Sequence, residues 1–288
     1  MTTGPEVRGL FHPPTSTFSY LAWDPATRAA AIIDPVLDYD GAAGRTDTAG
    51  AAALLAMIEH EGLQLQWILE THAHADHLSA AAFLHERTGA PVGIGRGITS
   101  VQANFRDIYN LGADFPVDGR QFDRLFDDGQ RFPLGELEVE VMATPGHTDD
   151  SVTYRIGDAA FVGDTLFAPD YGSARCDFPG GDAARLFASV QRLYRLPPET
   201  RLFLCHDYPP AGREPRCEWS VAEQRAGNVH INAGTREADF VAMRNERDAG
   251  LKMPALIIPS VQVNIRAGRL PEPEDNGRRY LRVPLDTL

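Results

Sequence analysis

Strand-type and helix-type patterns of hydrophobic and polar positions alternate in the first third of the chain. Residues 17–23 alternate and are rich in aromatics, and residues 29–33 and 65–69 are short apolar runs, which predicts three strands. Leu54, Leu55 and Ile58 recur at helical spacing before Gly62, which predicts a helix that ends there. The other expectations are a loop over 38–50, a helix over 78–87 and a strand around 91–94. This order of elements is typical of a layered α/β protein.

The middle of the chain is rich in strand patterns, and its last part is more charged. Strands are predicted over 137–142, 152–156, 159–162 and 201–205, with Gly, Pro and Asp between them. A helix is predicted over 182–193, with Asp182 as its N-cap and Leu186, Val190 and Leu193 on one face. After Pro209 we expect a helix over 238–248 and then a loop-rich tail. Because no boundary is sharp, we predict one domain over 1–288, with a core of about 15–210 and a C-terminal extension of about 211–288.

Composition and charge narrow the class of protein. The chain has 288 residues, of which 43% are hydrophobic and 23% charged, as in ordinary soluble proteins. Its formal charge of -13 argues against nucleic acid and anionic membranes as partners, since both attract basic surfaces. The longest apolar runs, such as residues 254–259, are too short to span a membrane, and the first residues do not resemble a signal peptide. Cys176, Cys205 and Cys217 form no CxxC pair, so we expect a reduced, cytoplasmic setting.

Seven residues of the kinds that bind metals follow predicted strands. The stretch THAHADH, residues 71–77, comes directly after the apolar run 65–69. Later strands lead into ATPGHTDDS, FVGDTLF and LFLCHDY. Imidazole and carboxylate suit zinc or iron, whereas calcium and magnesium prefer oxygen ligands. The seven candidates are His72, His74, Asp76, His77, His147, Asp164 and His206.

The ordered set of candidates is more informative than any single member. A lone His147 or His206 is more often a hydrogen-bonded structural histidine than a ligand. Four separated segments that each place a ligand type after an apolar strand are hard to explain by chance. Ligands at the carboxyl ends of strands lie where α/β sheets usually build their sites. The sequence therefore predicts a metal site.

The order of these residues resembles the metallo-β-lactamase superfamily, over about residues 15–210. The resemblance implies an αββα sandwich with the metal site at the sheet edge between the two halves. It identifies a fold and a site, and it leaves the reaction open.

The resemblance allows two ligand sets. In a two-metal site, His72, His74 and His147 would bind one ion and Asp76, His77 and His206 the other, with Asp164 bridging; such zinc-type sites hydrolyse thioesters or lactones, as glyoxalase II does. In a one-metal site, His72, His147 and Asp164 would hold Fe(II), as in the persulfide dioxygenases, with Asp76 orienting a ligand or a water. A third hypothesis, a metal-stabilised structural or redox-sensing module, fits poorly because structural zinc sites are closed cages.

The segment after Asp164 favours the dioxygenase over the hydrolase. The stretch from Gly172 to Phe178, with Arg175 and Asp177, is similar to the persulfide dioxygenase pattern, as are HDY at 206–208 and EQRAGNVH, FVAMRNERD and PSVQVNIRAG later on. The sequence departs from the mitochondrial enzymes in a longer stretch before Arg175 and in Ala174, where those enzymes have glycine. The implied reaction converts glutathione persulfide or a similar small persulfide, with O2 and water, to sulfite and thiol, using one Fe(II) per chain or, in the alternative, two zinc ions for hydrolysis.

Substrate contacts are assigned by chemistry alone. Glutathione carries two carboxylates and amide groups that need donors, for which Arg175 and Tyr208 are the first candidates. Arg225 and Asn228 are weaker candidates, because on an exposed helix a solvated role is more common. Cys176 is a candidate reactive thiol, although a buried or incidental cysteine is the more common case. Two further expectations are that Cys205 packs in a strand core and that the protein forms a homodimer.

Overall fold

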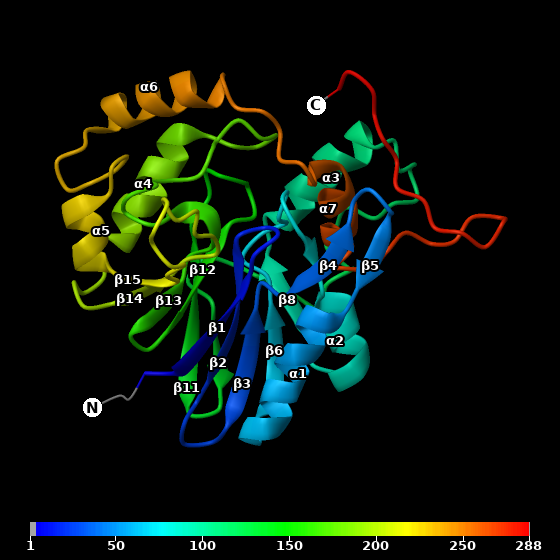
Figure 1. Cartoon of the computed structure of the whole chain (residues 1–288), viewed down its shortest axis with the longest axis horizontal. Coiled ribbons are helices and arrows are strands. Elements are labelled where there is room, and N and C mark those ends of the chain that lie inside the picture. The colour runs from blue at the N-terminus through cyan, green and yellow to red at the C-terminus, as the bar shows by residue number, and fades with distance from the viewer. Residues whose placement is uncertain (1–3, 288) are drawn as a thin grey trace.

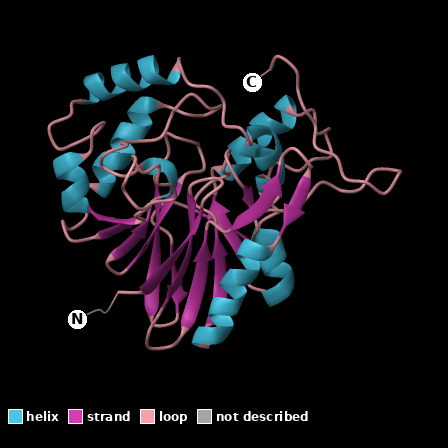
Figure 2. Cartoon of the chain, in the orientation of Figure 1, coloured by secondary structure: helices cyan, strands magenta, loops and turns pink. Residues whose placement is uncertain are grey.

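The computed structural model describes residues 4–287 as four stacked layers. Two six-stranded sheets lie face to face, and helices cover the outer side of each, as Figures 1 and 2 show. The predicted αββα sandwich is confirmed. The helices on the first sheet are α1 (Ala49–Glu61), α2 (Ala81–Thr88), α3 (Ile98–Ile108) and α7 (Ile257–Asn264), and those on the second are α4 (Ala183–Leu193), α5 (Val221–Gly227) and α6 (Glu237–Asp248).

The first sheet has the strand order β1-β2-β3-β6-β8-β9. Strands β1 to β3 are antiparallel neighbours, and β3, β6, β8 and β9 pair in parallel. A small sheet, β5-β4-β7, lies beside it. The bounds are β1 (Glu6–His12), β2 (Thr17–Trp23), β3 (Ala29–Ile33), β4 (Val36–Asp40), β5 (Arg45–Asp47), β6 (Gln64–Leu69), β7 (Leu78–Ser79), β8 (Val92–Gly95) and β9 (Arg124–Phe126).

The second sheet has the order β10-β11-β12-β13-β14-β15. All neighbours in it are antiparallel except β13 and β14, so β11, β13 and β14 run in one direction. Their carboxyl ends therefore meet at one edge. The bounds are β10 (Arg131–Leu134), β11 (Leu137–Ala143), β12 (Val152–Ile156), β13 (Ala159–Phe161), β14 (Arg201–Phe203) and β15 (Glu218–Ser220).

Strand periodicity explains how the layers share the core. In β2, Phe18 and Tyr20 pack between the two sheets, while Leu21 and Trp23 face the helices of the first sheet. This follows because successive side chains of a strand point to opposite faces. Both faces of the sheet are buried, so a run such as residues 29–33 is apolar throughout rather than alternating.

Most predicted elements are confirmed, and the helix caps explain two of the boundaries. Gly62 adopts a left-handed conformation, with φ of 62°, and ends α1. The Asp182 side chain accepts a hydrogen bond from the Arg185 amide at 2.7 Å and begins α4.

Two predictions about elements were partly wrong, and the prediction of a loop-rich tail left out one helix. Residues 38–50 are not simply a loop, because β4 and β5 form a hairpin there. The predicted helix over 78–87 begins with β7, which pairs with β4. The tail contains α7, whose side chains are buried nearly all round and which therefore lacks an amphipathic pattern. The division into a core and an extension stays a prediction.

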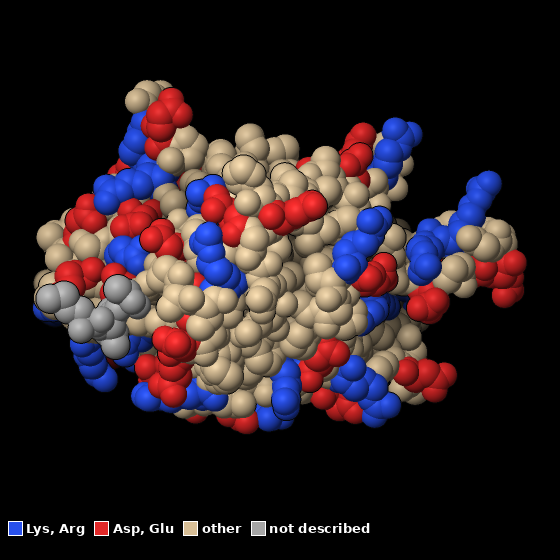
Figure 3. Space-filling model, turned by 90° about the horizontal axis from the view of Figure 1, so that it is seen from below, with Lys and Arg blue, Asp and Glu red and all other residues tan. Residues whose placement is uncertain are grey.

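The described residues show how long and apolar the helices are and how charges are spread over one face. No helix within residues 4–287 is long and apolar enough to cross a membrane. On the face shown in Figure 3, described basic side chains are interspersed with acidic ones and form no continuous basic area.

Candidate metal centre

The candidate ligands follow the ends of four strands. His72 comes after β6, His147 after β11, Asp164 after β13 and His206 after β14. Since β11, β13 and β14 run in the same direction, their ligands reach one edge of the second sheet. The prediction that each segment leaves an apolar strand is confirmed, and it explains how residues distant in sequence gather in one place.

Three of these residues form a compact buried group. The ligand atoms of His72, His147 and Asp164 all lie within 4.8 Å of one another. Asp164 Oδ2 lies 3.5 Å from His147 Nε2 and 3.8 Å from His72 Nε2. Two imidazoles and one carboxylate are the donor set that suits non-haem Fe(II).

Hydrogen bonds orient both imidazoles of this group. His147 donates from Nδ1 to the Arg175 carbonyl at 2.8 Å, which leaves Nε2 to face Asp164. The Thr71 hydroxyl donates to Asp34, so its oxygen can accept the Nδ1–H of His72 at 3.0 Å. Partners on the far nitrogen fix the tautomer of a metal-binding histidine.

The electrostatics of His72 and Asp164 also suit metal binding. Burial, followed by the charge on His74 and His147, lowers the pKa of His72 well below its usual value, so the imidazole is neutral and has a lone pair. Burial raises the pKa of Asp164, which a nearby cation would oppose. Within residues 4–287, His72 Nε2 and Asp164 Oδ1 have no hydrogen-bond partner.

A second buried group lies beside the first. Its ligand atoms, from His74, His77, Cys205 and His206, also lie within 4.8 Å of one another. Cys205 is buried, as expected of a core residue, and its sulfur also lies beside these three histidines. The alternation of side chains along a strand predicts that residue 205 points inward. It does not predict that the histidines lie on that side.

His206 connects the second group to two carboxylates. Its Nε2 lies 3.0 Å from Asp76 and 3.5 Å from Asp164. Burial opposes the charged form, but these two carboxylates raise the pKa of His206 well above its usual value. Among the described atoms, His74 Nδ1 and His77 Nε2 have no hydrogen-bond partner.

His74 is held by a pair of buried carboxylates that the sequence analysis missed. Its Nε2 lies 3.1 Å from Asp34 and 3.4 Å from Glu70. Burial opposes protonation, yet Asp34 raises the pKa of His74 well above its usual value. Asp34 follows β3 and Glu70 follows β6, so the rule used for the other ligands, a polar residue directly after an apolar strand, would have found both.

A cavity of about 430 Å³ opens beside the first group. His147, Asp164 and Asp76 line its inner end. Aromatic side chains form part of its wall, and residues of α6 and of the α6–α7 segment complete it. These residues are Phe167, Tyr171, Phe178 and Tyr208, together with Arg244, Arg247, Leu251, Lys252, Pro254, Ala255 and Leu256.

Arg175 lines the cavity, but its guanidinium already forms hydrogen bonds within the protein. Its Nε and one terminal nitrogen each donate to Asp177 at 2.6 Å, and the other donates to the Lys252 carbonyl at 2.7 Å. Its guanidinium also lies 4.9 Å from the centre of the Phe178 ring. Arg175 therefore lies where the predicted substrate contact requires, with its guanidinium already paired, and its role as a substrate contact stays a prediction. In contrast, Arg247 and Lys252 pair with no carboxylate among residues 4–287.

The other predicted substrate contacts differ from one another. Tyr208 lines the cavity, with its ring 5.7 Å from that of His206, and burial raises the pKa of its phenol, which stays neutral. Arg225 lines a different cavity, beside Tyr194. Asn228 is buried and donates to Gly172 and Gln224, so its amide is used within the fold. Neither Arg225 nor Asn228 is therefore part of the described cavity.

Cys176 is buried next to the cavity. Burial, with Asp248 adding to it, raises the pKa of its thiol to about 12. A reactive cysteine needs a lowered pKa and access to solvent. Cys176 has neither of these features, so its burial favours the alternative of a buried, incidental cysteine.

Comparisons with known proteins agree with this geometry. The family model described as Metallo-beta-lactamase superfamily matches residues 12–206. The chain is 54% identical to a probable metallo-hydrolase of Burkholderia pseudomallei, over 98% of this chain and 99% of that protein. It is 53% identical to a beta-lactamase hydrolase-like protein of Xylella fastidiosa, over 99% of this chain, and spans 65% of that protein's length.

More distant matches carry a more specific name. The chain is 31% identical to the mitochondrial persulfide dioxygenase ETHE1 of Homo sapiens, over 91% of this chain and 88% of that protein. The crystal structure of ETHE1 from Myxococcus xanthus is 34% identical and superposes with a TM-score of 0.73, covering 92% of this chain and 100% of that one.

Proposed function

This chain belongs to the metallo-β-lactamase superfamily, whose members are metal-dependent enzymes, and we propose that it is a persulfide dioxygenase with one non-haem Fe(II) per chain. The observation that carries the proposal is the buried group of His72, His147 and Asp164, of which His147 and Asp164 line a cavity. The likeness to proteins named ETHE1 supports it.

The residues of this group fit Fe(II). His72 Nε2 and Asp164 Oδ1 are buried without a hydrogen-bond partner among the described residues, which is costly unless an ion satisfies them. His147 Nε2 faces the same carboxylate. When bound, Fe(II) supplies the redox chemistry and open positions for a sulfur ligand and O2.

The chain's own residues would bind and orient the persulfide. Arg247 and Lys252, the unpaired cations of the cavity wall, are suited to hold the carboxylates of a thiol such as glutathione. The neutral Tyr208 hydroxyl can donate to an amide or sulfur atom. Phe167 and Phe178 exclude water from the inner end, which strengthens the electrostatic interactions there. Holding both reactants in one place lowers the entropic part of the barrier.

The proposed reaction is balanced as R–S–S⁻ + O2 + H2O → R–SH + SO3²⁻ + H⁺. The bond between the two sulfur atoms breaks, and the terminal sulfur gains three bonds to oxygen. The sulfur atoms together lose the electrons that both oxygen atoms of O2 gain. The thiol and the released proton take up the hydrogens of water.

The second buried group, which contains His74, His77, Cys205 and His206, favours a different function, that of a two-metal hydrolase. His74 Nδ1 and His77 Nε2 are buried without a hydrogen-bond partner among the described residues, and together with His206 they could hold a second ion. A zinc-type pair of ions would make this protein a hydrolase of thioesters or lactones. The names of the more similar relatives are of this kind.

An oxygen electrode separates the two functions. Protein reconstituted anaerobically with Fe(II) is mixed with glutathione persulfide, and a zinc-loaded sample is the matched control. We expect iron-dependent oxygen consumption with one sulfite formed per O2. A flat trace, together with zinc-dependent hydrolysis of a glutathione thioester, would reject the dioxygenase and support the hydrolase.

A further inference from the structure

The loop that carries most of the candidate ligands has little regular structure of its own. Residues 70–77 form neither helix nor strand, yet nearly all of this segment is buried. Buried backbone groups need hydrogen-bond partners, and in this loop side chains supply several of them. Asp34 accepts from the Thr71 amide, and Asp150 accepts from the Ala73 amide, each at 2.7 Å. Both of these residues lie within the part of the chain that the family model matches.

The carbonyl groups of the same loop are held from a distant part of the chain. Asn264, the last residue of α7, donates from Nδ2 to the carbonyls of His74 and His77, and its Oδ1 accepts from the Ser79 amide. All three hydrogen bonds measure 2.8 Å, and the side chain is buried. A single amide thus spans the segment from the second histidine to β7. Its donors and its acceptor fix which way the amide faces.

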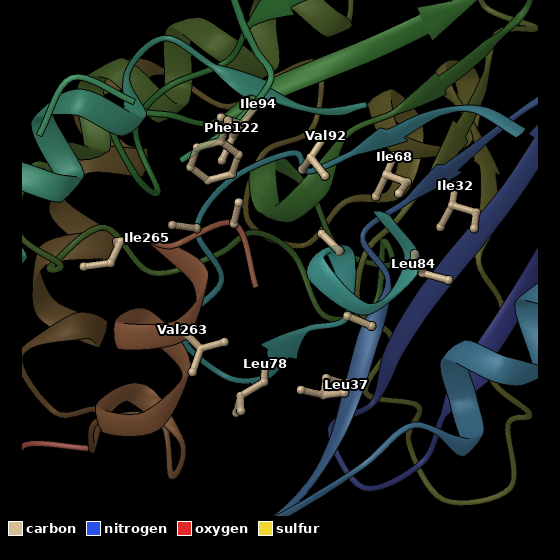
Figure 4. Close-up of a cluster of buried hydrophobic side chains, with 14 of the residues drawn as sticks. Ile32, Leu37, Ile68, Leu78, Leu84, Val92, Ile94, Phe122, Val263 and Ile265 are labelled. Carbon is tan, nitrogen blue, oxygen red and sulfur yellow. The ribbon is translucent and has the colours of Figure 1, made fainter. Parts of the chain in front are cut away.

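The backbone around Asn264 packs closely against the core. Val263 and Ile265 belong to the buried cluster that also contains Leu78, and Figure 4 shows these side chains. Gly268 has φ of 78°, and a Cβ there would lie 2.8 Å from the Ser79 carbonyl oxygen. Such a contact is too short for any side chain, so the backbone at this position must approach β7 without one. Asn264 is therefore held on both sides and cannot drift away from the loop.

We infer that Asn264 is a positioning residue of the metal centre: it fixes the backbone of the 74–77 loop, and through it the candidate ligands His74, Asp76 and His77 and their neighbour His72. The C-terminal extension thereby completes a site whose ligands all lie within residues 72–206. The inference rests on the proposed metal centre and does not depend on which reaction that centre performs.

Gln102 offers a matched control. Its buried amide also makes three hydrogen bonds, all of 2.9 Å: to the Gln121 side chain, to the Ile265 carbonyl and from the Gly119 amide. It anchors the residue next to Asn264 but touches no part of the ligand loop. Asn264→Ala and Gln102→Ala therefore remove equal numbers of buried hydrogen bonds from neighbouring sites, and only the first frees the loop.

The test measures metal affinity and stability separately. Fe(II) affinity of each folded variant is measured anaerobically by competition with a chromophoric chelator and repeated with Zn²⁺, while the Tm is measured on the metal-free protein. We expect both Ala variants to lower the Tm, and Asn264→Ala alone to weaken metal affinity by about tenfold to a hundredfold, as loss of a partner that orients ligands does. Equal metal affinity for the two variants, with a similar loss of Tm, would overturn the inference.

A second variant covers the case in which Asn264→Ala does not fold. Asn264→Asp keeps the size of the side chain and the acceptor for the Ser79 amide, and it loses donors to the two carbonyls. We expect it to weaken metal affinity in the same direction, and unchanged affinity would overturn the inference. If the wild-type protein bound Fe(II) and Zn²⁺ but, when loaded with Fe(II), consumed no oxygen with persulfide, the proposed reaction alone would be rejected. The ratio of the variants' metal affinities would still test the role of Asn264.

Discussion

The strand ends that carry the ligands and the C-terminal extension contribute to the same site in different ways. At the strand ends, His72, His147 and Asp164 form the group that we propose holds the metal. The extension contributes in two ways. The loop between α6 and α7 and two unpaired cations line the cavity, and Asn264 of α7 contacts the ligand loop. The ligand motif can be recognised in the sequence because its histidines lie close together. The residues of the extension that surround it cannot be recognised, because no local sequence pattern links them to the motif.

Removing a candidate ligand at a strand end should have the largest effect on metal binding and on activity. His147→Ala deletes one of the two imidazoles of the three-residue group, so we expect Fe(II) retention and oxygen consumption to fall below detection. His206→Ala is the comparison, since His206 lies outside that group and should leave Fe(II) bound. Metal content per chain and oxygen-electrode rates check both. Loss of iron from His206→Ala would favour a two-metal site.

A buried ion pair should show that the extension also contributes to stability. Arg244 and Asp248 in α6 pair with each other, and Asp248 also accepts the Cys176 amide at 2.8 Å. Asp248→Ala leaves a buried arginine without its partner, for which we expect a loss of about 3–5 kcal/mol in the free energy of unfolding. Urea unfolding measures it.

The comparison with Asn264 sharpens this prediction. Asp248 accepts from the Cys176 amide, which belongs to the same peptide group as the Arg175 carbonyl that accepts from His147. Because this contact reaches one ligand through one peptide group, we expect folded Asp248→Ala to lose less Fe(II) affinity than Asn264→Ala. Suppose that Asp248→Ala lowered Fe(II) affinity as much as Asn264→Ala does. Any loss of stability in the extension would then lower metal affinity, and the effect of Asn264 on the ligand loop could not be separated from its effect on stability.

Most of the fold, and the meeting of the candidate ligands in one place, could be predicted because both leave local patterns. Apolar runs and caps such as Asp182 mark the elements, and a polar residue after each run marks the site. Asp34 and Glu70 obey the same rule and were missed only because neither is part of a histidine motif. α7 and the contacts of Asn264 could not be predicted, because hydrogen bonds between residues nearly two hundred positions apart depend on the packed structure.

Removing the unpaired cations of the cavity wall should have a smaller effect, because it should weaken only substrate binding. Arg247→Ala and Lys252→Ala each remove an exposed positive charge from the cavity wall, so we expect KM for glutathione persulfide to rise about twofold to fivefold for each, with little change in kcat. Arg236→Ala is a suitable control, because Arg236 is exposed and paired with Asp239. An unchanged KM would indicate that the carboxylates of the thiol bind elsewhere, and a lower kcat would indicate a role in the reaction itself.

Cys176 should give the smallest effect, because its thiol lies beside the site without belonging to it. With a pKa raised to about 12, its thiolate fraction at pH 8 is roughly a thousandfold below that of an ordinary exposed cysteine. We therefore expect Cys176→Ser to keep wild-type turnover, and Cys176 of the folded protein to resist iodoacetamide at pH 8 while the same residue reacts readily in urea. Peptide mass spectrometry reports the labelling. Rapid alkylation in the folded state would show that the cavity wall around α6 opens, and the extension would then be a mobile cover rather than a fixed wall.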